Sequence, residues 1–437
     1  MNDRQLGLGM ATALVVGNTI GMGIFMQPAA LAPFGLNALT GWAAVIFGCV
    51  CLALTFAALA RKLPQADGPF GYVRSTLGEV IAFPALWCYW ISVWVTNAVL
   101  SISVVGYFIS VFPSAAAIPP AALAVSFMWI FVGVNLLGIK SGGRVQVATS
   151  LLKIVPLLLV MVVGAFSILS NPGEYTPNLP VNPITGHDSM AAAAIALYAM
   201  LGFESAAVAA GRVKDPERTI PRATLIGTLM VAGLYVAIVA IGLLVVPQAT
   251  LAASDAPFVT IADHLLGAGN GRWLSLFVVI SGLGCLNGWT LLSGELTRTL
   301  ASHKLLPAVL GESNRYGAPW ASLILTGVLA TALGLMNYSA TLVGAFTKLS
   351  LIVSAANLPL YVCCSFALFA LLKKDSAGLR PGLWFAGAGG IAFAAFAFKG
   401  VGWEPFLWAL ALAFAGVPIY LWMRQRQRRA GAPVASG

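Results

Sequence analysis

The sequence predicts an all-α integral membrane protein with twelve transmembrane helices, of which the first and the sixth are broken. Hydrophobic residues make up 59% of the 437 residues and charged residues only 9%, against about 25% charged residues in an ordinary soluble domain. Apolar runs of about 20 residues, long enough to cross a bilayer, recur along the whole chain. Glycine-containing interruptions occur within two of these runs.

The expected spans follow one another with short connections. They lie at residues 7–31, 37–60, 80–110, 119–139, 145–169, 189–210, 221–246, 273–299, 318–337, 341–371, 381–398 and 405–423. No cleavable signal pattern precedes the first span. We expect a single transmembrane domain over residues 1–437, because no soluble stretch approaches the size of a separate fold.

Positive charges are distributed unevenly over the segments between these spans. With the N-terminus inside, cytoplasmic segments hold twenty of the 24 Lys and Arg residues, the outer loops hold Arg272 and Lys399, and the spans hold Lys153 and Lys348. The positive-inside rule therefore predicts two cytoplasmic termini in a cell inner (plasma) membrane. The net charge of +10 reflects this topology and contact with anionic lipid, and it does not indicate a nucleic-acid site.

The first span contains the sequence GNTIGMG at residues 17–23, near its middle. A helix in lipid must satisfy its backbone groups internally, so this composition indicates backbone opened toward a cavity. Secondary transporters build substrate sites in this way. The alternative is that Gly21 and Gly23 only allow another helix to pack closely.

The sixth span is interrupted in the same way, by YAMLGFE at residues 198–204. Spans one and six would enter from opposite sides of the membrane, as in two inverted five-span repeats that share a site at the midplane. The repeats would cover residues 1–169 and 189–371, with two additional helices at 381–423. The Asn- and Pro-rich loop 170–188 would separate them.

Three motifs resemble those of the amino acid/polyamine/organocation (APC) transporter family. They are GNTIGMGIF in the first span, YAMLGFESAAVAAG followed by VKDPERTIPRAT at the sixth, and GCLNGWTLLSGE in the eighth. Within this family, the chain is most similar to the basic amino acid/polyamine antiporters, such as arginine/agmatine antiporters, over essentially its whole length. The resemblance implies the LeuT-type fold of five-plus-five inverted repeats, with alternating access.

The two breaks together describe an amino acid as the ligand. N–H groups at the start of the second half of span one suit a carboxylate, because they form the positive end of a helix dipole. Carbonyl groups at the sixth-span break suit an ammonium group. Trp289 would pack on the substrate side chain, although Trp is also a common packing residue. The resemblance implies substrate contacts at Thr19, Met22, Gly23, Ser92, Val93, Asn97, Leu100, Tyr198, Leu201 and Trp289.

The resemblance also implies gates, with Trp289 as a middle gate. Tyr198 stands where these antiporters have a tryptophan outer gate. Two members of an inner gate are matched by Tyr89 and Glu204. Its third member would be Leu360 or Tyr361, depending on the register.

Two ionisable residues are candidates for proton coupling, Lys153 in the fifth span and Glu204 after the sixth-span break. A charged lysine is costly inside a membrane, which favours its exchanging a proton during transport. Proton-coupled members of the family have a lysine at a similar position, whereas arginine/agmatine antiporters do not, and the alternative is a structural role. Glu295 would form a helix-face pair with Arg298.

Two residues depart from the arginine/agmatine pattern. Met22 replaces a serine, which leaves carboxylate binding to main-chain N–H groups. Lys348, in the tenth span, would lie near a bound guanidinium if it faced the cavity, and would then disfavour cationic substrates. Alternatively, its long side chain packs between helices or reaches outward.

We therefore expect a secondary active amino acid transporter or exchanger that is proton-linked. A proton-coupled symporter for neutral amino acids is the alternative. A channel is disfavoured, because paired broken helices suit alternating access better than a continuous pore. The expected partners are an amino acid or amine substrate, protons and the lipid bilayer, and a homodimer is compatible with the sequence.

An enzyme is not expected, because the chain has no HExxH, GxSxG or Walker pattern. Its six cysteines lack metal-ligand spacing. We therefore expect neither a cofactor nor a bound metal.

Overall fold

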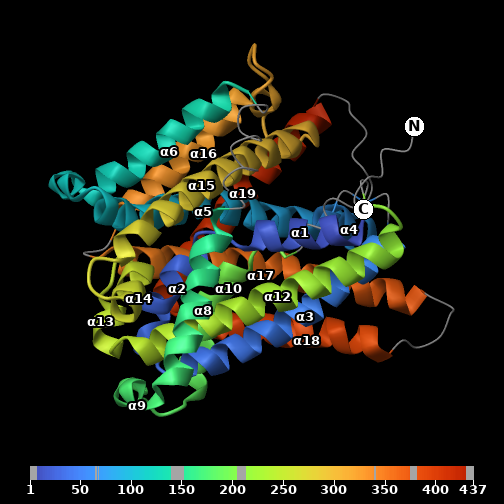
Figure 1. The fold of residues 1–437 in the computed structure, drawn as a ribbon. Helices are drawn as coiled ribbons and strands as arrows, with labels where there is room; N and C mark the ends of the chain where they lie inside the picture. The colour runs from blue at the N-terminus through green and yellow to red at the C-terminus, as the bar shows by residue number, and fades with distance from the viewer. Residues whose placement is uncertain are drawn as a thin grey trace.

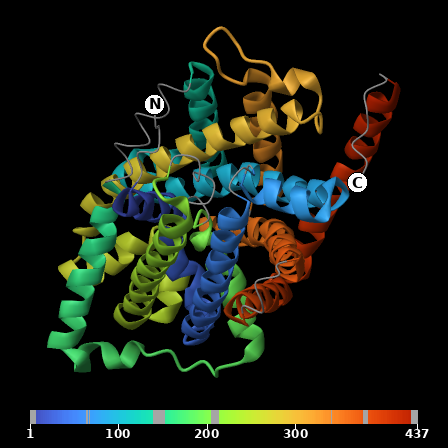
Figure 2. The ribbon, with the colours of Figure 1, turned by 90° about the vertical axis from the view of Figure 1, so that its right-hand side faces the viewer.

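The computed structural model describes residues 7–63, 66, 68–138, 152–203, 213–338, 341–374 and 381–429. The helices pack into one bundle (Figures 1 and 2). The first half contains α1 (Leu8–Thr19), α2 (Gly23–Leu31), α3 (Asn37–Lys62), α4 (Gly68–Leu77), α5 (Glu79–Val111), α6 (Pro120–Leu136), α8 (Ile154–Ser170), α9 (Pro172–Tyr175) and α10 (Gly186–Met200). The second half contains α12 (Pro216–Val245), α13 (Gln248–Ala252), α14 (Pro257–Leu266), α15 (Gly271–Ser302), α16 (Trp320–Met336), α17 (Leu342–Lys374), α18 (Pro381–Gly400) and α19 (Trp403–Arg429).

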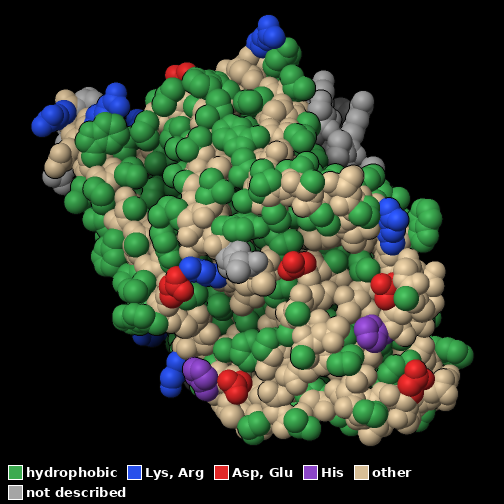
Figure 3. Space-filling model, turned by 90° about the vertical axis from the view of Figure 1, so that its left-hand side faces the viewer, with side chains coloured by type: hydrophobic (Ala, Val, Ile, Leu, Met, Phe, Trp, Pro, Cys, Tyr) green, Lys and Arg blue, Asp and Glu red, His purple; other side chains and the backbone are tan. Residues whose placement is uncertain are grey.

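The described helices are those of a multi-pass membrane protein. Seven are long and apolar enough to cross a bilayer, namely α3, α5, α12, α15, α17, α18 and α19. Two bent pairs also qualify, α1 with α2 at an angle of 51° and α8 with the short segment after it at 103°. Each of the twelve expected spans overlaps a helix, although α6 and α16 have only 17 residues each. Charged side chains are sparse on the face shown in Figure 3.

The centre of the bundle is α5, which packs along α15 and α17. Its most apolar stretch is 94% buried, whereas the corresponding stretch of α19 is only 11% buried. Figure 2 shows α19, in red, at the edge of the bundle. Because α19 is apolar but unburied, its surface suits contact with lipid rather than with water.

The two interrupted segments lie against each other. The first break separates α1 from α2, and the second follows Met200 at the end of α10. Gly202 has a φ of 101°, and a Cβ at this position would lie 2.8 Å from the Asn18 carbonyl oxygen. On the other side, Gln27 Nε2 of α2 donates to the Ile195 carbonyl of α10 at 2.9 Å. These contacts bring the expected site residues of both breaks together.

The connection between α13 and α14 is tied to α5 and α17. The half-buried Asp255 accepts a hydrogen bond from the Val343 N–H at the start of α17, at 3.3 Å. This N–H belongs to the first turn of the helix and has no partner within it. On α5, Gly106 leaves no room for a side chain, because a Cβ at this position would clash with the Asp255 carbonyl oxygen.

Tyr107 of α5 ties the next turn of this region to α2. Its hydroxyl donates to the Phe25 carbonyl at 2.6 Å and accepts from the Phe258 N–H of α14 at 3.2 Å. The Phe25 and Phe258 rings also meet edge to face at 4.8 Å. The segment after α12 is therefore fixed to α2, α5 and α17.

We predict that Asp255→Ala lowers the thermal stability of the detergent-purified protein, because the start of α17 loses its acceptor. The loss of a capping acceptor costs about 0.5–2 kcal/mol. Asp255→Asn retains an acceptor oxygen and should unfold closer to the parent temperature. Identical unfolding temperatures for Asp255→Ala and the parent would contradict the capping role.

Candidate functional site

A small cavity, with about 20 Å³ of space, lies where the two breaks meet. Its walls come from the α1–α2 break, α5, the end of α10 and α15. The lining residues are Asn18, Thr19, Gly21, Met22, Gly23, Thr96, Leu100, Tyr198, Ala199, Leu201 and Trp289.

Most of the expected substrate contacts are brought together at this cavity. Seven of the ten line it, namely Thr19, Met22, Gly23, Leu100, Tyr198, Leu201 and Trp289. Four lining residues were not expected. Asn18, Gly21 and Ala199 are chain neighbours of expected contacts, and Thr96 lies one helical turn before Leu100, a spacing that places both on one face of α5.

Three expected contacts, all on α5, are not among the described lining residues. The Ser92 hydroxyl donates to the Tyr89 carbonyl at 2.7 Å, and Val93 is fully buried. Asn97 points to α15, where its amide donates to the Ser293 hydroxyl and accepts from the Thr290 hydroxyl, each at 3.4 Å.

The end of α1 is held by side chains from two other segments. A helix leaves its last four carbonyl groups without intrahelical partners. The Lys153 ammonium donates to the Gly17 carbonyl, and the Tyr235 hydroxyl of α12 donates to the Thr19 carbonyl at 3.1 Å. Lys153 is only 4% exposed, so this carbonyl offsets part of the cost of burying its amine. The contact of Tyr235 was not predicted from the sequence, because no motif marks this residue.

The start of α2 and the end of α10 face the same cavity. A Cβ at Gly23 would lie 3.0 Å from Cε1 of Tyr198, so the Tyr198 ring lies directly over the first residue of α2. The other side of this ring meets Phe346 of α17 edge to face at 5.7 Å. The Met22 side chain packs on Gly282 of α15. The positive end of one helix dipole and the negative end of another thus point into one space.

Among the described inner-gate candidates, Tyr89, Leu360 and Tyr361 are not lining residues of this cavity. Tyr89 is half-buried on α5, and Glu204 lies outside the described residues. Of the two candidates for the third position, Tyr361 meets the sixth-span break, with its ring 5.8 Å from that of Phe203. The Phe56 ring of α3 lies 5.9 Å from both.

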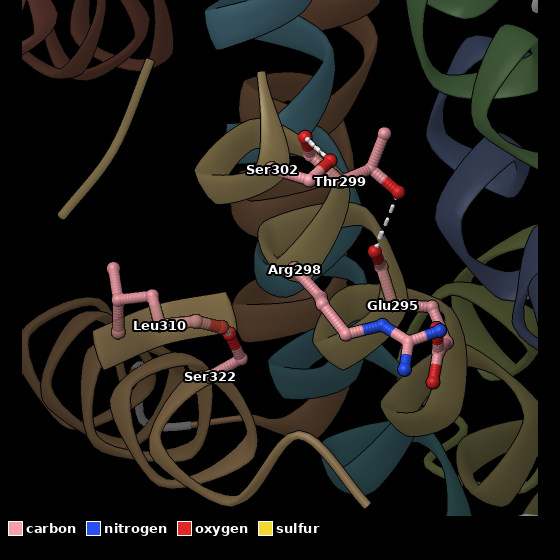
Figure 4. Close-up of polar contacts among 6 residues, drawn as sticks. All are labelled: Glu295, Arg298, Thr299, Ser302, Leu310 and Ser322. Carbon is pink, nitrogen blue, oxygen red and sulfur yellow. Dashed lines mark hydrogen bonds and ion pairs between the residues drawn. The ribbon is translucent and has the colours of Figure 1, made fainter. Parts of the chain in front are cut away.

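Two charged pairs lie outside the cavity lining. Lys348 pairs with Glu404 at the start of α19, at 2.5 Å, so its charge is directed to the outer helix. Glu295 pairs with Arg298 at 2.6 Å on one face of α15, as expected (Figure 4). Such partly exposed pairs contribute only about 0–1 kcal/mol to stability.

Comparison with known proteins identifies relatives over most of the chain. Residues 6–422 match the family described as amino acid permease. A cadaverine/lysine antiporter of Escherichia coli is 33% identical over 76% of this chain and 74% of its own length. An arginine/ornithine antiporter of Pseudomonas aeruginosa is 30% identical over 75% and 70%. A putrescine transporter of Haemophilus influenzae is 27% identical over 96% and 97%.

A solved structure also resembles this fold. A manganese transporter of Eremococcus coleocola aligns with a TM-score of 0.53, over 96% of this chain and 94% of that chain. The two sequences are 12% identical, so the likeness concerns the fold alone.

Proposed function

Since the chain belongs to the amino acid permease family, we propose that it is a secondary active exchanger of basic amino acids and amines in the inner membrane. The observation that carries the proposal is the cavity between two opposed helix ends. Three relatives are named for cadaverine and lysine, arginine and ornithine, and putrescine. All of these compounds carry a net positive charge at neutral pH.

The cavity offers a partner for each group of such a substrate. N–H groups at the start of α2, near Met22 and Gly23, suit the carboxylate, and carbonyl groups at the end of α10 suit the α-ammonium group. Trp289 presents an aromatic surface to the same cavity. A side-chain ammonium or guanidinium over this ring gains about 0.5–2 kcal/mol.

The position of Lys348 removes an argument against cationic substrates. A lysine charge in the cavity would repel a cationic side chain, but Lys348 pairs with Glu404 instead. This removes the main argument for a neutral amino acid symporter. Met22 has no hydroxyl group to donate to a substrate carboxylate, which leaves main-chain N–H groups to bind it. These groups would bind the carboxylate of any amino acid in the same way.

The proposed mechanism is alternating access in a twelve-span protein with two inverted repeats and cytoplasmic termini. Broken helices that contact each other at a central cavity support it. Lys153 is the proposed proton-coupling residue. Its ammonium holds the Gly17 carbonyl at the end of α1, and loss of the proton would weaken this contact and favour a second arrangement of the break. Glu204 is the second candidate.

We predict that proteoliposomes loaded with lysine or cadaverine take up radiolabelled lysine much faster than empty ones. An exchanger completes its cycle only with a substrate on each side. Arginine and ornithine should compete with lysine, and leucine should not. Equal uptake into empty and loaded liposomes would contradict exchange, and stronger competition by leucine would contradict the cationic substrate class.

We predict that Trp289→Ala weakens lysine binding about tenfold or more, because the cation loses its aromatic partner and the cavity loses a wall. Lys348→Met is the control, because that lysine contacts α19 and not the cavity, and it should leave the affinity unchanged. Equilibrium binding to purified protein measures both. Parent-like affinity in Trp289→Ala would remove the proposed site.

We predict that Lys153→Ala binds substrate but loses the acceleration of uptake by an inward proton gradient. Lys153→Arg retains a donor for the Gly17 carbonyl but cannot release its proton, so it should also lose the response. Uptake is measured with and without the gradient. If both variants respond as strongly as the parent, Lys153 has a structural role and Glu204 becomes the candidate.

A further inference from the structure

We infer that Tyr235 is a positioning residue that shapes the first break for a substrate carboxylate, and so serves amino acids but not amines that lack a carboxylate. This inference rests on the proposed function and deepens it. Tyr235 is not a lining residue of the cavity. It acts through the backbone at the end of α1, beginning at Thr19.

A single hydroxyl group holds the backbone where the first break begins. The Tyr235 hydroxyl donates to the Thr19 carbonyl, the last of α1, at 3.1 Å. Directly after Thr19, Ile20 is extended, with a φ of −69° and a ψ of 95°. The hydroxyl thus satisfies a carbonyl that the break removes from the helix ladder.

Packing fixes the position of this hydroxyl. Tyr235 is fully buried, and its ring meets Trp42 of α3 edge to face, at 5.8 Å and 71°. Nearby, a Cβ at Gly227, two turns earlier on α12, would lie 2.7 Å from the Val15 side chain of α1. Because α12 packs closely on both α1 and α3, the Tyr235 hydroxyl is held in a fixed position at the break.

The consequence for binding concerns the N–H groups that follow the break. Met22 and Gly23 line the cavity, so a carboxylate there would meet the N–H groups at the start of α2. The first N–H groups of a helix have no intrahelical partner, and the Tyr198 ring above Gly23 limits how far α2 can shift. A rigid linker therefore presents these N–H groups in fixed positions. Cadaverine, which is lysine without its carboxylate, makes no use of them.

The test compares lysine and cadaverine as substrates of Tyr235→Phe, which keeps the ring against Trp42 and removes only the hydroxyl. We expect the KM for lysine to rise about three- to tenfold, the effect of losing about one hydrogen bond, and the KM for cadaverine to remain unchanged. The ratio of the two KM values does not depend on the amount of folded protein, so partial loss of folding does not obscure it.

Tyr107→Phe is the matched control. Tyr107 is also a fully buried tyrosine with its hydroxyl bonded to the backbone, but its partners are Phe25 within α2 and Phe258 of α14, and not the end of α1. Its loss should affect both substrates equally. An equal change of both KM values in Tyr235→Phe, or no change, would overturn the inference and leave the exchange function standing. A parent protein that transports neither lysine nor cadaverine would overturn both.

Discussion

The structure depends on one constraint, that a helix broken inside a membrane must find partners for the backbone groups it exposes. Each unsatisfied group in hydrocarbon costs several kcal/mol, more than an ordinary hydrogen bond contributes to stability, about 0.5–1.5 kcal/mol. At the end of α1, the Lys153 ammonium and the Tyr235 hydroxyl supply donors. The break is therefore stabilised by specific side chains, one from the segment before α8 and one from α12.

The same constraint explains why the two breaks meet. Gly202 lies against the Asn18 carbonyl, and Gly23 lies under the Tyr198 ring, so each break uses a glycine where the other approaches. Close approach excludes lipid and leaves a small cavity between helix ends of opposite polarity. An amino acid, with a carboxylate and an ammonium group on one carbon, matches that polarity.

Much of this was predictable from the sequence, because the break motifs are local. The positions of α1, α2 and α10 and seven cavity residues followed from glycine placement and family resemblance. The α5 face was harder, because a helix that is buried on nearly all sides gives no periodic signal. Asn97 is turned toward Ser293 and Thr290, whereas Thr96, one residue earlier, lines the cavity.

Long-range partners could not be predicted from local patterns. Nothing near Lys348 in the sequence indicates that its partner is Glu404, and nothing in α12 marks Tyr235 as the donor to Thr19. Both contacts depend on how distant helices pack. The choice between Leu360 and Tyr361 as an inner-gate residue was likewise a question of helix rotation, and the structure places the Tyr361 ring beside that of Phe203.

The pairing of Lys348 with Glu404 also bears on the order in which the protein is made. Glu404 follows Lys348 by 404 − 348 = 56 residues. At a synthesis rate of about 5–20 residues per second, the lysine waits roughly 3–11 seconds for its partner. A lysine at the centre of a membrane helix costs about 2.5–3.5 kcal/mol on insertion. Lys348 lies only six residues into α17, where its side chain can reach the membrane surface. Its location near a helix end thus lowers the cost of the unpaired lysine in a nascent chain without α19. The ion pair forms once the last helix has been made.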